Sequence, residues 1–151
     1  MNHLRLAALG ARARSGALAA ALAAMLATGT GPPARAEEPQ PYSVEVSNVT
    51  AKVGEHAVMH ATIRFRDRYR VAEAYNNRVT KLSSYDDGVA FEREVVNAAV
   101  RDGTLAFAVG LQPTKPGKHA INGVFRFGYI ENGNTLKMIS VPLIASVTGT
   151  D

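Results

Sequence analysis

The sequence predicts an all-β protein, an immunoglobulin-like antiparallel β-sandwich of about seven to eight strands, preceded by a cleavable signal peptide. Three observations favour this fold class. Apolar and polar residues alternate with a period of two in several short segments, most clearly over 57–65. Turn residues recur about every 8–12 positions in the second half of the chain. No segment after residue 36 repeats with the period of a long helix.

Residues 1–36 have the three parts of a secretory signal. Residues 1–14 carry three arginines and no acid, 16–28 form an uncharged run rich in Ala and Leu, and 34–36 read Ala-Arg-Ala. The apolar run is shorter than the roughly 20 residues of a membrane-spanning helix. We therefore expect cleavage after Ala36, a periplasmic or secreted protein, and no transmembrane anchor in what remains.

Removing this segment changes the charge of the protein. The chain has 17 Lys and Arg against 13 Asp and Glu, and residues 1–36 hold four of the arginines and no acid, which leaves 13 of each sign. A domain with balanced charge gives no basis for nucleic-acid binding. The chain also has no cysteine, which excludes disulfides and thiol chemistry, so the fold depends on its apolar core.

The first half of the remaining chain is expected to contain three strands. A flexible leader, a first strand, a turn and a second strand are predicted at residues 37–41, 42–51, 52–55 and 57–65, within a single domain over 42–151. The second strand has the clearest alternation, with Met59 and Ile63 on its buried face. Residues 71–75 are compatible with the start of a short helix, and 78–82 alternate like a strand.

The second half is expected to be entirely strands and turns. Strands are predicted at 89–96, 105–111, 119–130 and 136–147, with turns at 86–88, 101–103, 113–118 and 132–133. Asn132-Gly133 suits a tight hairpin because both residues tolerate positive φ. Pro142 has no N–H to donate, which places an edge or a bulge within its strand.

A row of arginines is the most unusual feature after residue 36. Arg64, Arg66, Arg68 and Arg70 would lie on one face of an extended chain, where they could bind an anionic partner. The alternative is a solvated strand face neutralised by acids such as Glu92 and Glu94, or an edge strand charged against aggregation.

Loops are the other candidate contact surfaces, namely 85–88, 114–118 and 131–134, since loops on a rigid scaffold often carry binding. Candidate binding residues in or beside them are Tyr85, Lys118, His119, Tyr129 and Asn132. Tyrosines including Tyr129 could instead line an apolar cavity between the sheets.

No catalytic or metal-binding group is expected. His56 and His60 lie on a strand, roughly 13 Å apart at about 3.3 Å per residue, too far to share an ion. Asp86 and Asp87 precede a glycine and suit a turn better than a pair of catalytic carboxylates. No nucleophile and base are recognisable, so we expect no enzyme, no metal and no cofactor.

Four segments resemble a known family. Residues 75–82, 88–91, 105–109 and 115–127 resemble the N-terminal periplasmic domain of the thiol–disulfide interchange protein DsbD and its small stand-alone relatives. The resemblance implies an immunoglobulin-like sandwich with a docking role. The cysteine pair of that family would fall near 128–136, where this chain has none, so thiol–disulfide exchange does not carry over.

The sequence therefore favours a secreted or periplasmic, non-catalytic binding or protein-interaction module without redox cysteines. Its expected partner is another periplasmic or membrane protein. The alternative is a periplasmic carrier of a small ligand or metal with a pocket between the sheets.

Overall fold

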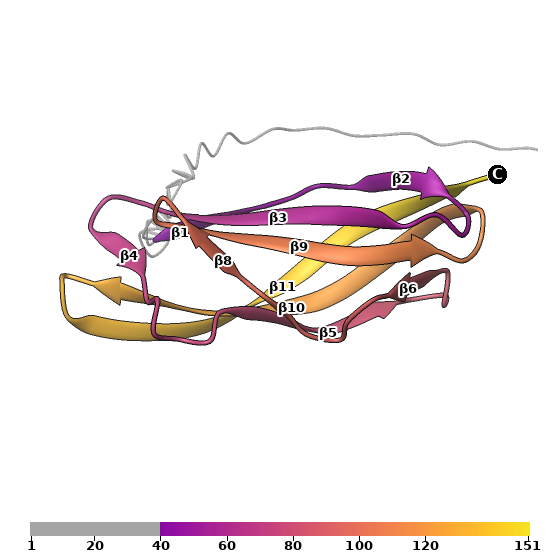
Figure 1. Ribbon diagram of the computed structural model, residues 1–151. Helices are drawn as coiled ribbons and strands as arrows, with labels where there is room; N and C mark the ends of the chain where they lie inside the picture. Colours follow the sequence, from indigo (N-terminus) through magenta and orange to yellow (C-terminus); the bar gives the residue numbers. More distant parts are fainter. Residues whose placement is uncertain (1–39) are drawn as a thin grey trace, which may run out of the picture. The chain divides into compact units, whose positions relative to one another are not determined.

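The computed structural model describes residues 40–151, which form two β-sheets packed face to face (Figure 1). The predicted all-β sandwich is confirmed. The predicted signal peptide and nearly all of the predicted leader lie outside the described residues. In the described part of the chain no helix is long and apolar enough to cross a membrane.

The first sheet has the strand order β1-β3-β9-β6, and β8 also pairs with β9. Its strands are β1 (Tyr42–Val46), β3 (Ala57–Phe65), β6 (Val89–Phe91), β8 (Ala99–Arg101) and β9 (Thr104–Pro113). The second sheet has the order β2-β11-β10-β5-β7, and β4 also pairs with β10. Its strands are β2 (Val49–Lys52), β4 (Tyr69–Val71), β5 (Arg78–Ser84), β7 (Val96–Asn97), β10 (Gly117–Glu131) and β11 (Thr135–Thr150). Among these pairs only β2 and β11 run parallel.

The core fills the space between the sheets. Its largest buried side chains come mainly from β3, β9 and β10, as the alternation predicted: Met59, Ile63, Leu105, Phe107, Leu111, Ile121, Phe125 and Phe127. The rings of Phe107 and Phe125 pack with centroids 5.1 Å apart and join the two sheets. Full burial of one such side chain contributes about 1.5–3 kcal/mol.

Two expected strands are each divided between the sheets, and two short strands that were not predicted, β4 and β8, are added, which gives eleven strands in the described residues. The stretch 42–51 leaves the first sheet after Val46, where the N–H of Ser47 donates to the carbonyl of His60, and continues as β2 in the second. The stretch 89–96 likewise ends in the first sheet at Phe91 and resumes as β7 in the second. Alternation reports which face is buried but not which sheet the strand joins.

The short helix considered for residues 71–75 does not form. Val71 ends β4, and turns lead from there to β5. Asn77 holds this connection on the second sheet, since its amide donates to the carbonyls of Ala72 and Tyr75 and accepts from the N–H of Gly128. A fully bonded, buried amide fixes a turn that no sequence period describes.

Candidate functional site

The predicted loops 85–88 and 114–118 meet at one end of the sandwich, called the histidine end, where β6 and the start of β10 lie (Figure 1). His119 connects them. Its Nδ1 lies 2.7 Å from Oδ2 of Asp86, and its Nε2 lies 2.8 Å from the carbonyl oxygen of Lys115. Both partners accept hydrogen bonds, so both bonds form together only when the ring carries two protons.

Further hydrogen bonds tie the same two loops. The hydroxyl of Thr114 donates to the carbonyl of Asp87, and the ammonium of Lys115 donates to the carbonyl of Asp86. Within the first loop, Oδ1 of Asp86 accepts from the N–H of Gly88 and from the hydroxyl of Ser84. The predicted turn at 86–88 is therefore present.

Close packing at the histidine end leaves room only for a glycine at position 88. A Cβ on Gly88 would lie 2.1 Å from Nδ1 of the His119 ring, and that ring is held on both sides. Gly149 on β11 has the same role beneath the second loop, because a Cβ there would lie 2.2 Å from the carbonyl oxygen of Lys115. The ring of His119 thus packs against the backbone of Gly88, and the second loop packs against the backbone of Gly149.

The pairing of His119 with Asp86 shifts the pKa of both side chains. The hydrogen bond from His119 lowers the pKa of the Asp86 carboxyl to about 2. The bond to Asp86, helped by the bond to the Lys115 carbonyl, raises the pKa of His119 above its ordinary value of 6.5. His119 is 4% exposed with both ring nitrogens bonded, so it fastens two loops and presents nothing to a partner.

The predicted row of arginines on one extended face is wrong, because the chain turns between Arg66 and Tyr69. The N–H of Tyr69 donates to the carbonyl of Arg66, and Arg68 has a φ of 80° in this turn. Arg64 remains on β3, and Arg70 begins again on β4 in the other sheet. The four arginines therefore belong to three different segments.

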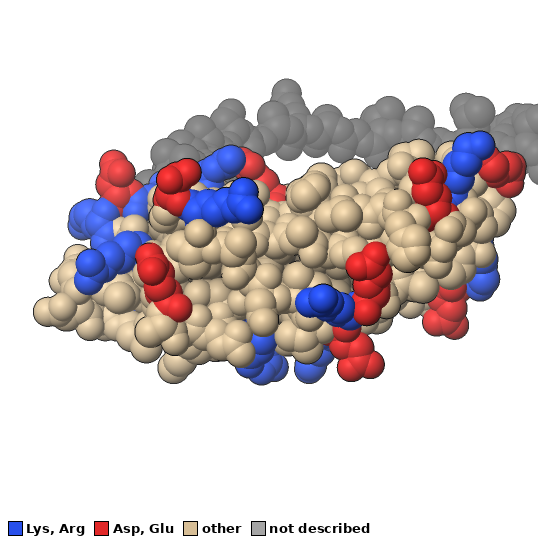
Figure 2. All heavy atoms as spheres, viewed as in Figure 1, with Lys and Arg blue, Asp and Glu red and all other residues tan. Residues whose placement is uncertain are grey.

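These segments nevertheless share the opposite end of the sandwich, called the arginine end, with the predicted loop 131–134 (Figure 1). Figure 2 shows Lys and Arg side chains gathered there, with a few acidic ones between them. Arg64 pairs with Glu45 at 2.6 Å, and Arg70 donates to the carbonyl of Gly133. A neighbouring acid therefore does neutralise Arg64, but it is Glu45 on β1 and not Glu92 or Glu94, neither of which pairs with an arginine within residues 40–151.

The remaining candidate residues divide by burial. Tyr129 is 9% exposed and packs against Phe65 and Tyr69, so it belongs to the core. Burial raises the pKa of its hydroxyl. Tyr85 is 88% exposed, and Lys118 and Asn132 are also exposed. Binding by these three remains a prediction.

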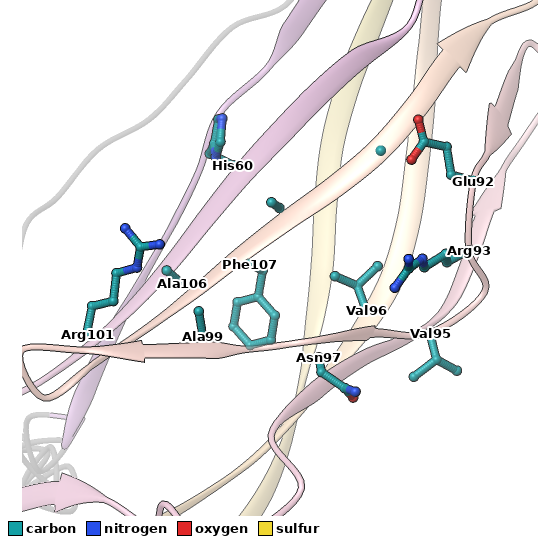
Figure 3. A pocket seen from close by; sticks show the side chains of 12 residues that line it. His60, Glu92, Arg93, Val95, Val96, Asn97, Ala99, Arg101, Ala106 and Phe107 are labelled. Atoms are coloured by element: carbon teal, nitrogen blue, oxygen red, sulfur yellow. The ribbon is translucent and has the colours of Figure 1, made fainter.

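The sequence did not predict a cavity of about 490 Å³ that lies beside β9, where the chain leaves the first sheet between β6 and β8 (Figure 3). Glu92 and Arg93 line it from the segment after β6, Ala99 and Arg101 from β8, and Phe107 from β9. We call it the gap cavity. It opens at a sheet edge and not between the sheets, where core side chains fill the space.

Backbone groups of β9 face the gap cavity. The N–H of Glu92 donates to the carbonyl of Gly110, so even-numbered residues of β9 direct their backbone groups to this side. Ala108 is the residue of this parity between the stretches paired with β6 and β8. Its N–H and C=O have no backbone partner within residues 40–151.

One edge of β11, on the side away from β10, is free over most of its length. β2 covers only Val147–Thr150, and β10 pairs along the other side. The N–H of Ser146 donates to Asn48, and the carbonyl of Thr150 accepts from Val53, so even-numbered residues of β11 face away from β10. Over residues 136–144 this row has no backbone partner in the described part of the chain.

Pro142 belongs to that free row. A backbone N–H at this position would point away from β10, so the proline removes no hydrogen bond between β10 and β11. The predicted edge at Pro142 is confirmed. The length of the free edge was not predicted, because it depends on where β2 joins the sheet.

No three His, Asp or Glu side chains within residues 40–151 converge to hold a metal ion. The His56–Glu92 pair lies over Gly110, and the His119–Asp86 pair lies at the histidine end. Neither pair is joined by a further acid or histidine.

Solved structures that are similar to this chain include two cohesin structures. No protein-family model and no curated protein matches the chain. The seventh ScaB type I cohesin of Pseudobacteroides cellulosolvens is 14% identical, and the match covers 72% of this chain and 92% of the cohesin with a TM-score of 0.45. A type I cohesin–dockerin complex from Clostridium thermocellum is 10% identical, covering 74% and 100% with a TM-score of 0.44.

The resemblance to the DsbD domain is therefore wrong, since the similar structures are cohesins. The motifs on which it rested are glycines within alternating apolar residues, a pattern that occurs in many β-sandwiches. At these identities and TM-scores no function is transferred from the cohesins to this chain.

Proposed function

We propose that this domain is a non-catalytic protein-interaction module that binds an extended segment of a partner as an additional strand on β11. The observation that carries the proposal is the free backbone row over residues 136–144. An added strand would pair with these N–H and C=O groups, which is a general way in which sheets recognise peptides.

Exposed apolar side chains lie along the same row. Leu136, Met138 and Ile144 are 51%, 63% and 71% exposed and share the parity of the free backbone groups. Covering them contributes roughly 25 cal/mol for each Å² of apolar surface removed from water. Backbone pairing and apolar burial thus favour the same surface.

Pro142 limits which strands can pair. It removes one donor from the middle of the row, a feature that protects edge strands from indiscriminate association. A partner must tolerate that missing bond, so the edge favours a particular segment over any extended chain.

The two histidine–carboxylate pairs support a role without catalysis. Both ring nitrogens of His119 are bonded, which leaves none to act as a base. His56 bonds Glu92 through Nδ1, and both side chains are largely exposed on the first sheet. The proposal includes export through residues 1–36, which N-terminal sequencing of the secreted protein at Glu37 would test.

The proposed function is tested by selecting random displayed peptides of about 12 residues, long enough to span the free edge, against the purified protein. Selected peptides should lose at least about tenfold in affinity with Met138→Ser and with Ile144→Ser, since each serine removes apolar cover from the edge without adding a charge. Val58→Ser is the matched control, because Val58 is 48% exposed on the outer face of the other sheet.

Two outcomes contradict the proposal. One is that every selected peptide binds the two edge variants as tightly as the wild type. The other is that the purified protein already forms a dimer through β11, shown by a dimer that Ile144→Lys converts to a monomer in analytical ultracentrifugation.

The gap cavity supports a second candidate function, a carrier of a small ligand. Its volume of about 490 Å³ lies in the range of small-molecule sites, and Ala108 offers one free N–H and one free C=O. Native mass spectrometry of the secreted protein tests it. A bound mass that Ala108→Phe removes supports the carrier, and protein without any bound mass contradicts it.

A further inference from the structure

The outer face of the second sheet carries positive charge without acids. The outward, even-numbered positions of β10 and β11 include Lys118 and Arg126 and no Asp or Glu. Arg126 lies directly opposite Arg78 of β5, and both are half-buried. Like charges at opposed positions of neighbouring strands are destabilising. Neither arginine forms a salt bridge within residues 40–151.

Two buried polar atoms on this face also have no partner. Nε of Arg126 and the hydroxyl of Thr80 are inaccessible to water and make no hydrogen bond within the described residues. Thr80 pairs with Val124, two positions from Arg126, so both lie in the same part of the sheet. Buried polar atoms without a partner are uncommon in native proteins, so the two atoms call for an explanation.

Arg126 is within reach of a strand added to β11. Its neighbour on β11 is Ser140, a small, exposed residue of the free row. Neighbouring strands lie about 4.8 Å apart, so an added strand would run about 10 Å from β10. Extended glutamate and arginine side chains together span that distance, and the short side chain of Ser140 leaves room between them.

We infer that the partner segment is acidic and apolar, with a carboxylate placed opposite Ser140 to pair with Arg126 and flanking apolar side chains over Met138 and Ile144. This inference rests on the proposed strand addition to β11. The carboxylate neutralises Arg126 and relieves its repulsion from Arg78. A charge-assisted hydrogen bond of this kind contributes more than a neutral one.

The peptides selected against the purified protein provide the test. We expect Asp or Glu at one position of the shared motif, and replacement by Gln or Asn should weaken binding about tenfold or more. Arg126→Gln should cause a similar loss, whereas Lys81→Gln on β5, which also removes one positive charge from the second sheet, should change affinity less than twofold. With Arg126→Glu, the same peptide carrying Lys at the acidic position should bind more tightly than its original form.

The outcomes separate the two proposals. Peptides that depend on Met138 and Ile144 but show no acidic preference, or bind Arg126→Gln unchanged, overturn this inference and keep strand addition. Acidic peptides that ignore the edge variants overturn strand addition and this inference with it. If Arg126→Glu lowers the melting temperature too far for binding studies, the Gln variant and the peptide substitutions give the same decision.

Discussion

The histidine end and the arginine end of the sandwich both consist of loops rich in polar residues, yet they are built differently. At the histidine end, side chains and backbone of two loops bond one another around the buried ring of His119. At the arginine end, Arg68 lies 5.8 Å from the ring of Tyr69 and Arg70 reaches one carbonyl, around a hollow of about 290 Å³.

The difference shows how burial assigns roles to polar residues of the same type. A buried charged group is stable only when it is paired, so the His119–Asp86 pair must be complete for the two loops to hold their places. Exposed arginines are solvated and need no partner. Substitutions should therefore damage folding at the histidine end and leave it almost unchanged at the arginine end.

The same substitution at two glycines gives the largest contrast. Gly88→Ala places a methyl group 2.1 Å from the fixed His119 ring, and we expect a loss of about 3 kcal/mol, as in overpacked cores. Gly133→Ala meets no atom within 4 Å, and its φ of 85° costs only about 1 kcal/mol. Urea denaturation measures both, and equal losses would remove the contrast.

Removing one polar side chain at each end should give the next largest difference. His119→Ala leaves the carboxylate of Asp86 without its main partner and the Lys115 carbonyl unpaired, so the urea midpoint should fall clearly. Arg70→Ala loses one exposed hydrogen bond and should change the free energy of unfolding by about 0.5 kcal/mol or less. A loss of stability for Arg70→Ala that is larger than the loss for His119→Ala would contradict this order.

The pH dependence of stability should follow the pair at the histidine end. The contribution of His119 is complete below its ordinary pKa of 6.5 and is lost as pH rises through its raised value. The contribution of Asp86 is present above 3.8 and is lost as pH falls through about 2. The difference in free energy of unfolding between the wild type and Asp86→Asn should be largest between pH 4 and 6.5. Chemical denaturation at a series of pH values measures it. A constant difference from pH 2 to 9 would exclude the ion pair.

The smallest effect is expected for the exposed pair of Arg64 and Glu45, whose side chains are more than half exposed. Arg64→Ala should reduce the free energy of unfolding by at most about 1 kcal/mol, and added salt should reduce the difference further. Thermal melts in low and high salt measure it. A loss as large as that of Gly88→Ala would show that the arginine end is also a structural clamp.

The elements with strong alternation could be predicted from sequence. Met59 and Ile63 on β3 and Phe125 and Phe127 on β10 are buried as expected, because each strand has one face on the core. The turns at Asp87 and at Asn132-Gly133 were also predictable, because Asp, Asn and Gly tolerate the positive φ that these positions have. Local chemistry decides such features.

The candidate sites could be predicted only in part. The loops and Pro142 were identified by residue type, but the pairing of His119 with Asp86 joins residues far apart in the chain, and no local pattern reports it. The prediction of an arginine row was wrong because the chain turns at Arg66–Tyr69 and is not extended there. The role of Arg126 could not be predicted, because it depends on its neighbours on two other strands, Ser140 and Arg78.

The sequence by itself determined the fold class and the buried face of each long strand, because side-chain direction alternates along the backbone and needs no partner to be defined. Only the tertiary structure decided which edges are covered and which polar groups are paired. β2 joins β11 at Val147–Thr150 and stops, which leaves residues 136–144 free. The loops close on His119, which buries it. Both outcomes depend on contacts between distant segments, and such contacts exist only once the sheets have assembled.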